Sequence, residues 1–375
     1  MKPIKLKVNT KSESYSIIIG SNLVNNLNSY LKGDLITFNQ CLLIIDKNVP
    51  KKMISKITNS LKKESKNKKI YNFIFDANEK NKNINYSIKI LQILLNKNFS
   101  RRDCLITIGG GITGDVGGFV ASLYKRGINF VNLPTTLLSQ VDSSIGGKTG
   151  VNTKEGKNLV GNFYQPKIVI SDIDFLQSLP KREIVCGYGE IFKHSLILNR
   201  NFFRYLEINS SKILKIKSPY IEKAIFESCK IKKNIVEKDE KEIGLRKILN
   251  FGHTFAHAFE AAFGYSKKLN HGEAVILGIV TALKFGTENK LTLLKDYKKI
   301  INHVLKAKLP SNIKNYFSYK DLNKILNFMS KDKKNISKKL NLILLKKIGS
   351  AVIHNEYQIL KVRNFLKKEL TNQNL

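Results

Sequence analysis

Residues 104–119 read CLITIGGGITGDVGGF, a short apolar run followed at once by six glycines in ten residues. The run Cys104–Ile108 predicts a buried strand, and the segment after it is typical of a tight turn that opens a helix. Gly109, Gly111 and Gly114 fit the pattern GxGxxG, in which backbone amides can approach a pyrophosphate because no side chain intervenes. The same glycines could also form a purely structural turn. The stretch therefore predicts a strand–turn–helix unit and favours a dinucleotide at the turn.

Further strands and helices alternate around this unit. One segment with helical periodicity, Ile84–Leu95, precedes it. Such alternation predicts a largely parallel sheet whose ligands bind at the carboxyl ends of the strands. Alternating and β-branched runs predict strands at Lys5–Val8, Tyr15–Ile19, Cys41–Asp46, Ile70–Phe75, Cys104–Ile108, Phe130–Leu133 and Ile168–Ser171.

After Pro180 the pattern changes to long helical segments with few strand signals. We therefore expect two domains, an α/β Rossmann-like nucleotide-binding domain over residues 1–178 and an all-α domain over residues 179–375. The predicted helices of the second domain are Glu183–Asn199, Phe202–Ile213, Tyr220–Lys238, Leu245–Ala262 and Gly272–Lys284.

The composition is that of a globular protein with an excess of lysine. The formal net charge of +36 comes mostly from lysines spread along the whole chain of 375 residues. Nucleic-acid surfaces usually combine clustered arginines with interleaved aromatic residues, which no stretch does here, so a nucleic-acid partner is not expected. The positive field should still attract anionic substrates. The chain shows no signal-peptide pattern, no bilayer-spanning run and no CxxC motif among its four cysteines, so we expect a cytoplasmic enzyme without a membrane partner.

An acidic side chain on the ribose usually accompanies a dinucleotide turn. No Asp or Glu ends the next predicted strand, Phe130–Leu133, but Asp46 ends the earlier run from Leu42. Asp46 could hold a ribose hydroxyl, although an Asp at a strand end is also a common helix cap. The sequence leaves both roles open.

Histidines and one glutamate mark the helical half. His253 and His257 lie one turn apart on one face of a predicted helix, His271 follows a short connection, and Glu190 lies on an earlier helix. Two histidines and a carboxylate, with positions left for water or substrate, are the usual layout of a catalytic divalent-metal site. Spacing alone nominates His253 and His257 as a pair of ligands, because the HxxxH interval resembles that of zinc-binding helices.

Between these regions, residues 140–161 mix glycines with cationic and hydroxyl side chains and lack the apolar period of a core element. Gly147-Lys148-Thr149 resembles the end of a P-loop, yet no glycine stands where that loop needs its first one. We therefore reject an ATP-binding loop.

Taken together, the motifs resemble those of the 3-dehydroquinate synthase family of sugar phosphate cyclases. The resemblance rests on Gly109–Phe119, Leu133–Leu138, Gln140–Gly161, Asn250–His257 and His271–Ala274, which occur in the family's order. It implies NAD in the N-terminal domain, zinc or cobalt in the helical domain and substrate in a cleft, with a homodimer as a possible assembly. The chain departs from the family at Asn78, where Gly is usual, and at Gly187-Tyr188-Gly189-Glu190, where Gly-Leu-Ala-Glu is usual.

Position by position, the resemblance assigns Glu190, His253 and His271 as metal ligands and moves His257 to the substrate. The implied substrate-binding and catalytic residues are Arg126, Lys148, Asn158, Lys193, Arg246, Asn250 and His257, with Lys333 or Lys334 reaching in from the C-terminal part. The implied NAD contacts are Asp46, Asn48, Glu79, Lys82, Gly111, Ile112, Thr113, Gly114, Asp115, Thr135, Thr136, Asp142, Lys148, Lys157, Phe175, Leu176, Gln177 and Ser178.

The implied reaction converts 3-deoxy-D-arabino-heptulosonate 7-phosphate to 3-dehydroquinate and phosphate, a step of the shikimate pathway toward aromatic amino acids. A metal polarises a secondary alcohol so that hydride passes to NAD, phosphate is eliminated, the hydride returns, and an intramolecular aldol closes the ring. Two rival readings are another sugar phosphate cyclase and a metal-dependent alcohol dehydrogenase of related fold. The dehydrogenase has no use for so many phosphate-directed cations, and the intact motifs at residues 143–152 and 156–161 favour dehydroquinate synthase over other cyclases.

Overall fold

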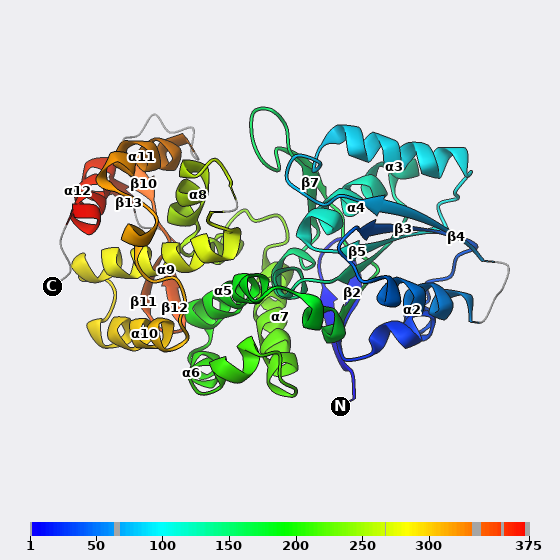
Figure 1. The fold of residues 1–375 in the computed structure, drawn as a ribbon, viewed down its shortest axis with the longest axis horizontal. Coiled ribbons are helices and arrows are strands. Elements are labelled where there is room, and N and C mark those ends of the chain that lie inside the picture. The colour runs from blue at the N-terminus through cyan, green and yellow to red at the C-terminus, as the bar shows by residue number, and fades with distance from the viewer. Residues whose placement is uncertain (1, 64–67, 267, 332–338, 354–355, 372–375) are drawn as a thin grey trace. The chain divides into compact units, whose positions relative to one another are not determined.

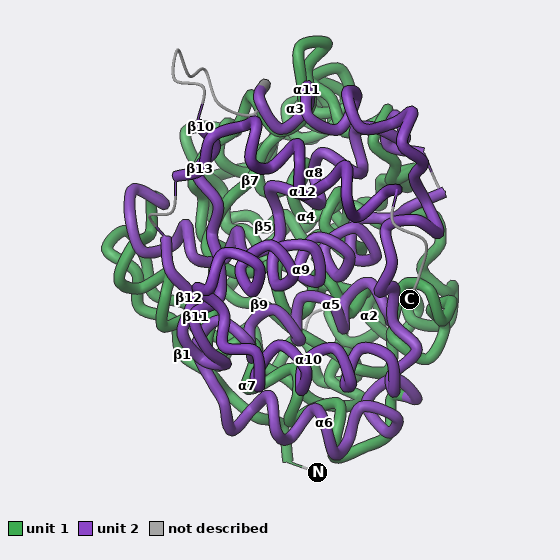
Figure 2. The backbone as a smooth tube through the Cα atoms, turned by 90° about the vertical axis from the view of Figure 1, so that its left-hand side faces the viewer, with its two compact units in different colours: residues 1–184, 216–241 green, residues 185–215, 242–375 purple. Residues whose placement is uncertain are grey.

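The computed structural model describes residues 2–63, 68–266, 268–331, 339–353 and 356–371 (Figure 1). They form two compact units, each made of two separate stretches of the chain (Figure 2). Unit 1 comprises Met1–Ile184 and Ile216–Lys241, and unit 2 comprises Val185–Lys215 and Glu242–Leu375. No helix among the described residues is both long and apolar enough to cross a bilayer.

Unit 1 is built on a seven-stranded sheet of order β1-β2-β9-β6-β5-β3-β4. Strand β1 is antiparallel to β2, and the other neighbours are parallel. Each predicted strand is present, with ends displaced by no more than one residue. The strands are β1 (Ile4–Asn9), β2 (Ser14–Gly20), β3 (Gln40–Asp46), β4 (Lys69–Phe75), β5 (Cys104–Gly109), β6 (Asn129–Pro134) and β9 (Ile168–Asp172).

Helices cover both faces of this sheet because its central strands are apolar on both sides. On β3, Leu43 and Ile45 face one hydrophobic core, while Leu42 and Ile44 face the other, as the two-residue period of a strand requires. Residues of α1 (Leu27–Gly33) and α2 (Lys51–Lys62) fill the first core, and residues of α3 (Ile84–Asn96) and α4 (Gly111–Leu123) fill the second.

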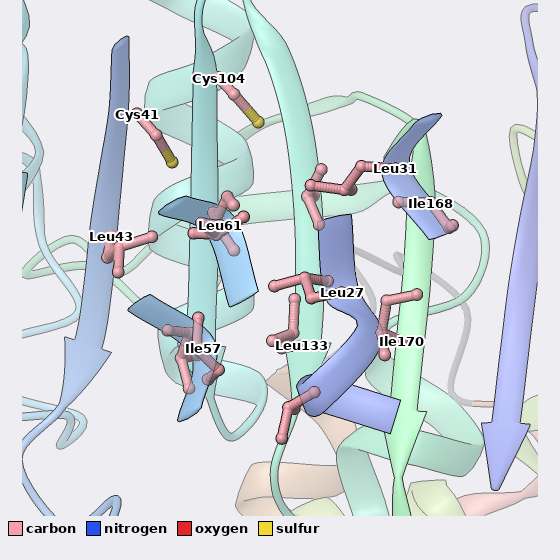
Figure 3. Packing of buried hydrophobic residues seen from close by; sticks show 14 of the residues in the cluster. Leu27, Leu31, Cys41, Leu43, Ile57, Leu61, Cys104, Leu133, Ile168 and Ile170 are labelled. Atoms are coloured by element: carbon pink, nitrogen blue, oxygen red, sulfur yellow. The ribbon is translucent and has the colours of Figure 1, made fainter. Parts of the chain in front are cut away.

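Figure 3 shows the first core, where Leu27 and Leu31 of α1 pack near Leu133, Ile168 and Ile170 of the sheet. These side chains are fully buried. Such packing holds the loops at the carboxyl ends of the strands in fixed positions. The other short elements of unit 1 are η1 (Leu23–Asn26), η2 (Tyr124–Arg126), η3 (Ser139–Ser143), the hairpin β7 (Lys148–Val151) and β8 (Val160–Phe163), and η4 (Ile173–Ser178).

Helix α7 (Tyr220–Lys238) belongs to unit 1, although it lies far beyond residue 178, where the sequence suggests a domain boundary. Lys232 Nζ is 2.6 Å from Asp142 Oδ1, and the Cys229 thiol donates to the Gln140 carbonyl at 3.3 Å. The helix also packs against β1 and β2. Unit 1 is therefore completed by a segment that returns from unit 2.

Unit 2 is mainly helical and has two small antiparallel strand pairs, β10 with β13 and β11 with β12. The α/β-plus-helical fold class predicted from the sequence is confirmed. The elements are α5 (Lys181–Leu198, its first turn in unit 1), α6 (Arg200–Leu214), η5 (Leu245–Asn250), α8 (His253–Ala262), α9 (His271–Glu288), α10 (Leu294–Lys306), η6 (Ile313–Asn315), η7 (Tyr319–Asp321), α11 (Leu322–Lys331), β10 (Lys339–Asn341), β11 (Leu344–Lys347), β12 (Ser350–Val352), β13 (Glu356–Gln358) and α12 (Ile359–Thr371).

The single helix predicted over residues 245–262 is wrong, because the backbone turns sharply at Gly252. Its φ of 80° lies in the left-handed region, and a Cβ there would come 2.8 Å from the backbone nitrogen of Ile279. The segment therefore splits into η5 and α8, and His253 becomes the first residue of a helix.

Candidate active site

The carboxyl ends of β3 and β5 are neighbours at a topological switch point of the sheet. From β3 the chain runs outward to β4, then crosses back to β5 and continues to β6 on the opposite side. In open α/β sheets, ligands bind in the crevice outside such a point. Asp46 ends β3 and Gly109 ends β5, so the predicted ribose contact and the glycine turn lie at this crevice.

Glycines at this turn and in the helix that follows it are closely packed. A Cβ at Gly109 would lie 2.5 Å from Thr113 Oγ1, and one at Gly117 would lie 2.0 Å from Thr107 Cγ2. Helix α4 begins at Gly111, so its unpaired amides and its dipole are available to an anion at the turn. The turn fits the pyrophosphate of a dinucleotide.

Asp46 is the candidate ribose contact. Its Oδ1 accepts hydrogen bonds from the backbone and side-chain amides of Asn48 at 2.9 and 3.0 Å. It does not cap α2, which starts at Lys51 without a side-chain cap. Burial raises the pKa of Asp46, although the bonds from Asn48 act in the opposite direction. Of the two roles that the sequence leaves open, the cap of α2 is excluded and the ribose contact stays a prediction.

Lys82 is a buried cation beside the start of α4. Its Nζ lies 2.5 Å from Asp115 Oδ2 and from Asn158 Oδ1. Burial raises the pKa of Asp115 above its usual value even though Lys82 opposes this effect. The structure thus brings together two residues predicted to contact NAD and one predicted to contact the substrate.

A second pair in unit 1 joins Lys157 to Glu79, with Nζ 3.1 Å from Oε1. Asn152 links this pair to the first one: its amide donates to Glu79 Oε2 at 2.8 Å, and its Oδ1 accepts from the Asn158 backbone at 3.0 Å. Burial raises the pKa of Glu79, but Lys157 and Asn152 outweigh it and lower the pKa overall. The ion pair and hydrogen bonds of Glu79 therefore hold the polar segment 148–161 against the loop that precedes α3.

The remaining candidates of unit 1 are more scattered. Thr135 and Thr136 follow β6, and the Thr135 amide donates to the Gly109 carbonyl at 2.9 Å. Phe175 belongs to the hydrophobic core, which leaves mainly its backbone for a ligand. The exposed candidates are Asn48, Arg126 in η2, Lys148 on β7, and Gln177 and Ser178 in η4. Leu176 is buried, and Asp142 forms an ion pair with Lys232. The first turns of α4 contain Gly111, Ile112, Thr113 and Gly114.

Unit 2 brings Glu190, His253 and His271 together, with one possible ligand atom from each within 4.8 Å of the others. Glu190 Oε1 is 3.6 Å from His253 Nε2 and 4.0 Å from His271 Nε2. The Glu190 side chain is fully buried, and Oε1 has no hydrogen-bond partner among the described residues. A buried carboxylate without such a partner is costly unless an ion compensates it.

The donor set fits a divalent ion. Two imidazole nitrogens and one carboxylate oxygen are the ligands of many catalytic zinc sites, which keep a further position open. The Lys193 ammonium forms an ion pair with Glu190 Oε2, leaving Oε1 toward the histidines. The arrangement is a candidate metal centre made of side chains from α5, α8 and α9.

Close helix crossings set the distances within this centre. The Gly272 amide donates to Cys186 Sγ at 3.0 Å, and a Cβ on Gly272 would lie 2.3 Å from the Cys186 backbone, so α5 and α9 touch here. A Cβ on Gly278 would lie 2.2 Å from the Gly252 carbonyl, so α8 and α9 also touch. The three ligand-bearing elements converge because these glycines carry no side chain.

Most of the other site candidates of unit 2 are close in sequence to Glu190 or His253. His257 lies one turn after His253 on α8, is exposed, and is not in the three-residue cluster, although its ring centroid is 5.3 Å from that of His253. Lys193 and Arg246 are buried, and Asn250 donates to Glu242 Oε1 at 3.0 Å. Lys333 and Lys334 lie outside the described residues.

The sequence did not nominate three residues that form hydrogen bonds or ion pairs with candidate site residues: Asn152, Lys232 and Glu260. Glu260 Oε2 is 3.1 Å from His271 Nδ1. Its position seven residues after His253 puts it on the same helix face, a spacing that could have drawn attention to it. Asn152 and Lys232 carry no comparable signal, because their partners Glu79 and Asp142 lie 73 and 90 residues away in the sequence.

Comparisons with known proteins identify the family of this chain. The family models described as 3-dehydroquinate synthase N-terminal and C-terminal match residues 72–186 and 187–335. The 3-dehydroquinate synthase of Pelagibacter ubique (strain HTCC1062) is 60% identical over 98% of this chain and 99% of its own length. The chain belongs to the 3-dehydroquinate synthase family. The family predicted from the sequence motifs is confirmed.

Two solved structures share the fold of this family member. A 2-deoxy-scyllo-inosose synthase complexed with carbaglucose-6-phosphate, NAD⁺ and Co²⁺ has a TM-score of 0.86 at 24% identity and covers 97% of this chain and 100% of its own. The 2-epi-5-epi-valiolone synthase of Streptomyces hygroscopicus subsp. jinggangensis 5008, with NAD⁺ and Zn²⁺ bound, has a TM-score of 0.84 at 22% identity over 96% and 98%. At such identities the likeness shows the fold alone.

Proposed function

We propose that this chain converts 3-deoxy-D-arabino-heptulosonate 7-phosphate to 3-dehydroquinate and phosphate, with NAD and one divalent metal ion. The observation that carries the proposal is the buried Glu190 carboxylate facing His253 and His271, in a chain of this family. A zinc or cobalt ion and NAD are supported by this donor set, by the glycine turn and by the ligands of the two structural neighbours. We also propose a cytoplasmic location, as expected of an enzyme with this biosynthetic role.

In this proposal the chain's residues bind, orient and exchange protons. When bound, NAD would supply reversible hydride transfer, and the metal ion held by Glu190, His253 and His271 would supply polarisation of a substrate oxygen. The amides at the start of α4 would hold the pyrophosphate of NAD, with Asp46 on a ribose. Lys and Arg side chains such as Lys148, Lys193 and Arg246 would bind the anionic groups of the substrate by charge-assisted hydrogen bonds.

Proton transfer is assigned to the substrate and to His257 together. In the proposed substrate, the phosphate group would lie beside the proton to be removed, so it could serve as the base for its own elimination. The exposed His257 imidazole would then orient the substrate or relay a proton. The net proposed reaction is an elimination with ring closure and no net redox change.

A phosphate-release assay tests the proposal. With the heptulosonate phosphate, NAD and Zn²⁺ or Co²⁺, we expect steady release of phosphate without net NADH, and loss of release on adding a chelator. Glucose 6-phosphate is the control substrate, because it tests for another sugar phosphate cyclase. Continuous accumulation of NADH would indicate a dehydrogenase, and no phosphate release under any of these conditions would refute the proposed activity.

A further inference from the structure

His271 presents its two ring nitrogens to two different carboxylates. Nδ1 is 3.1 Å from Glu260 Oε2, while Nε2 faces Glu190 Oε1 at 4.0 Å. An ionised carboxylate only accepts hydrogen bonds, so the proton of a neutral His271 ring belongs on Nδ1. The lone pair of Nε2 then faces Glu190 Oε1, and the proposed ion would be bound between these two atoms.

Glu260 is well placed to impose this arrangement. It lies in the last turns of α8, the helix that begins with His253, and only 7% of it is exposed. The same helix therefore carries one proposed ligand and the partner of another. Neighbouring Phe259 packs on Phe317 with ring centroids 5.1 Å apart, which anchors this end of α8 within unit 2.

His253, the other imidazole of the cluster, makes a longer contact through its Nδ1 atom. His253 Nδ1 is 3.4 Å from the Phe251 carbonyl, near the outer limit of a hydrogen bond. A charged acceptor at 3.1 Å binds an N–H more strongly than a neutral acceptor at this distance. Of these two Nδ1 contacts, the one made by His271 is the stronger constraint on ring orientation.

We infer that Glu260 is a positioning residue of the metal centre: it holds His271 with the proton on Nδ1 and thereby keeps Nε2 free to bind the ion. A carboxylate behind a histidine ligand also makes the ligating nitrogen more basic. The inference rests on the proposed function, since it presupposes that unit 2 binds a divalent ion.

The test compares Co²⁺ binding by the full chain and its variants, followed by visible absorption of the bound ion. Wild type should bind one Co²⁺ per chain. Glu260→Gln keeps a neutral acceptor and should weaken binding by about 10-fold, whereas Glu260→Ala removes the acceptor and should weaken it by about 100-fold. The matched control is Glu288→Gln, which removes the same charge from the exposed end of α9 and should leave binding unchanged.

A second measurement needs no variant. In zinc-loaded wild type with ¹⁵N-labelled histidine, the His271 ring should carry its proton on Nδ1 and bind the ion through Nε2. Ligation through Nδ1, or equal Co²⁺ affinity of wild type and both Glu260 variants, would overturn the inference. Failure of wild type to bind any divalent ion would instead overturn the proposed function, so the two failures are distinguishable.

Discussion

Glu190 is the residue on which the candidate metal centre depends. A fully buried carboxylate carries a large desolvation penalty, and among the described residues Glu190 pairs with the ammonium of Lys193. Its Oε1 faces the Nε2 atoms of His253 and His271. A divalent ion bound by these three atoms would satisfy the carboxylate oxygen that does not pair with Lys193.

Replacing single members of the cluster should separate ligands from their neighbours. We expect Glu190→Ala and His271→Ala to abolish tightly bound metal, because each removes one of three ligand atoms. His257→Ala should retain the metal and lose activity by about 10²- to 10⁴-fold, the usual contribution of a proton-transferring side chain. Metal content after dialysis and phosphate release measure the two effects. Equal metal loss in all three variants would show that His257 is a ligand.

The residues of this centre could be nominated from the sequence, but their grouping could not be derived from spacing. His253 and His257 share a helix face, as the four-residue interval requires. Which of them faces Glu190 depends on how α5 and α9 cross α8, and that crossing is a tertiary feature. The family resemblance supplied the grouping that the structure also shows, with His257 outside the cluster.

At the scale of elements, glycines decide how closely the ligand-bearing helices approach. Gly272 lies against the Cys186 backbone, and Gly278 lies against Gly252. Gly189, where the family usually has Ala, is less crowded: a Cβ would be 3.0 Å from the Gly272 carbonyl and from Ile276 Cγ1. The crossing of α5 and α9 is therefore more sensitive at Gly272 than at Gly189.

A matched pair of substitutions tests this difference. Gly272→Ala places a methyl group against backbone and should force α5 and α9 apart, lowering stability by about 1–3 kcal/mol and weakening metal binding. Gly189→Ala needs a shift of only a few tenths of an ångström and should change stability by less than about 1 kcal/mol, because the added side chain also favours the helix. Thermal unfolding and Co²⁺ titration are the measurements. Similar losses in both variants would contradict the assigned packing.

Elements with a strong apolar pattern were the ones that the sequence could predict. All seven strands of the main sheet were found: five from buried apolar runs, and the edge strands β1 and β4, with one buried residue each, from their alternating or β-branched and aromatic residues. The hairpin β7–β8 was not, since β8 is exposed along most of its length and has no apolar alternation. The break at Gly252 was also missed, because its left-handed backbone is imposed by the packing of α9.

At the scale of the whole molecule, the chain does not divide at a single point. It leaves unit 1 near Ile184, returns at Ile216 and leaves again after Lys241. Near Pro180 the sequence pattern changes from alternating strands and helices to long helical segments. Helical periodicity, however, does not show which unit a helix packs against. Helix α7 shares the long helical pattern of residues 179–375, but it packs against elements of unit 1.

Unit 1 should therefore require α7 to fold. Ile225, Ile235 and Val236 of this helix are buried, and burying each such side chain contributes about 1.5–3 kcal/mol. Their sum is comparable with the total stability of a typical domain, about 5–15 kcal/mol. Lys232 adds its ion pair with Asp142. A fragment of residues 1–215 should then show no cooperative thermal unfolding, whereas residues 1–241, which differ only by the segment containing α7, should unfold cooperatively. Circular dichroism during heating compares the two, and a cooperative transition of the shorter fragment at the same temperature would mean that α7 is dispensable to unit 1.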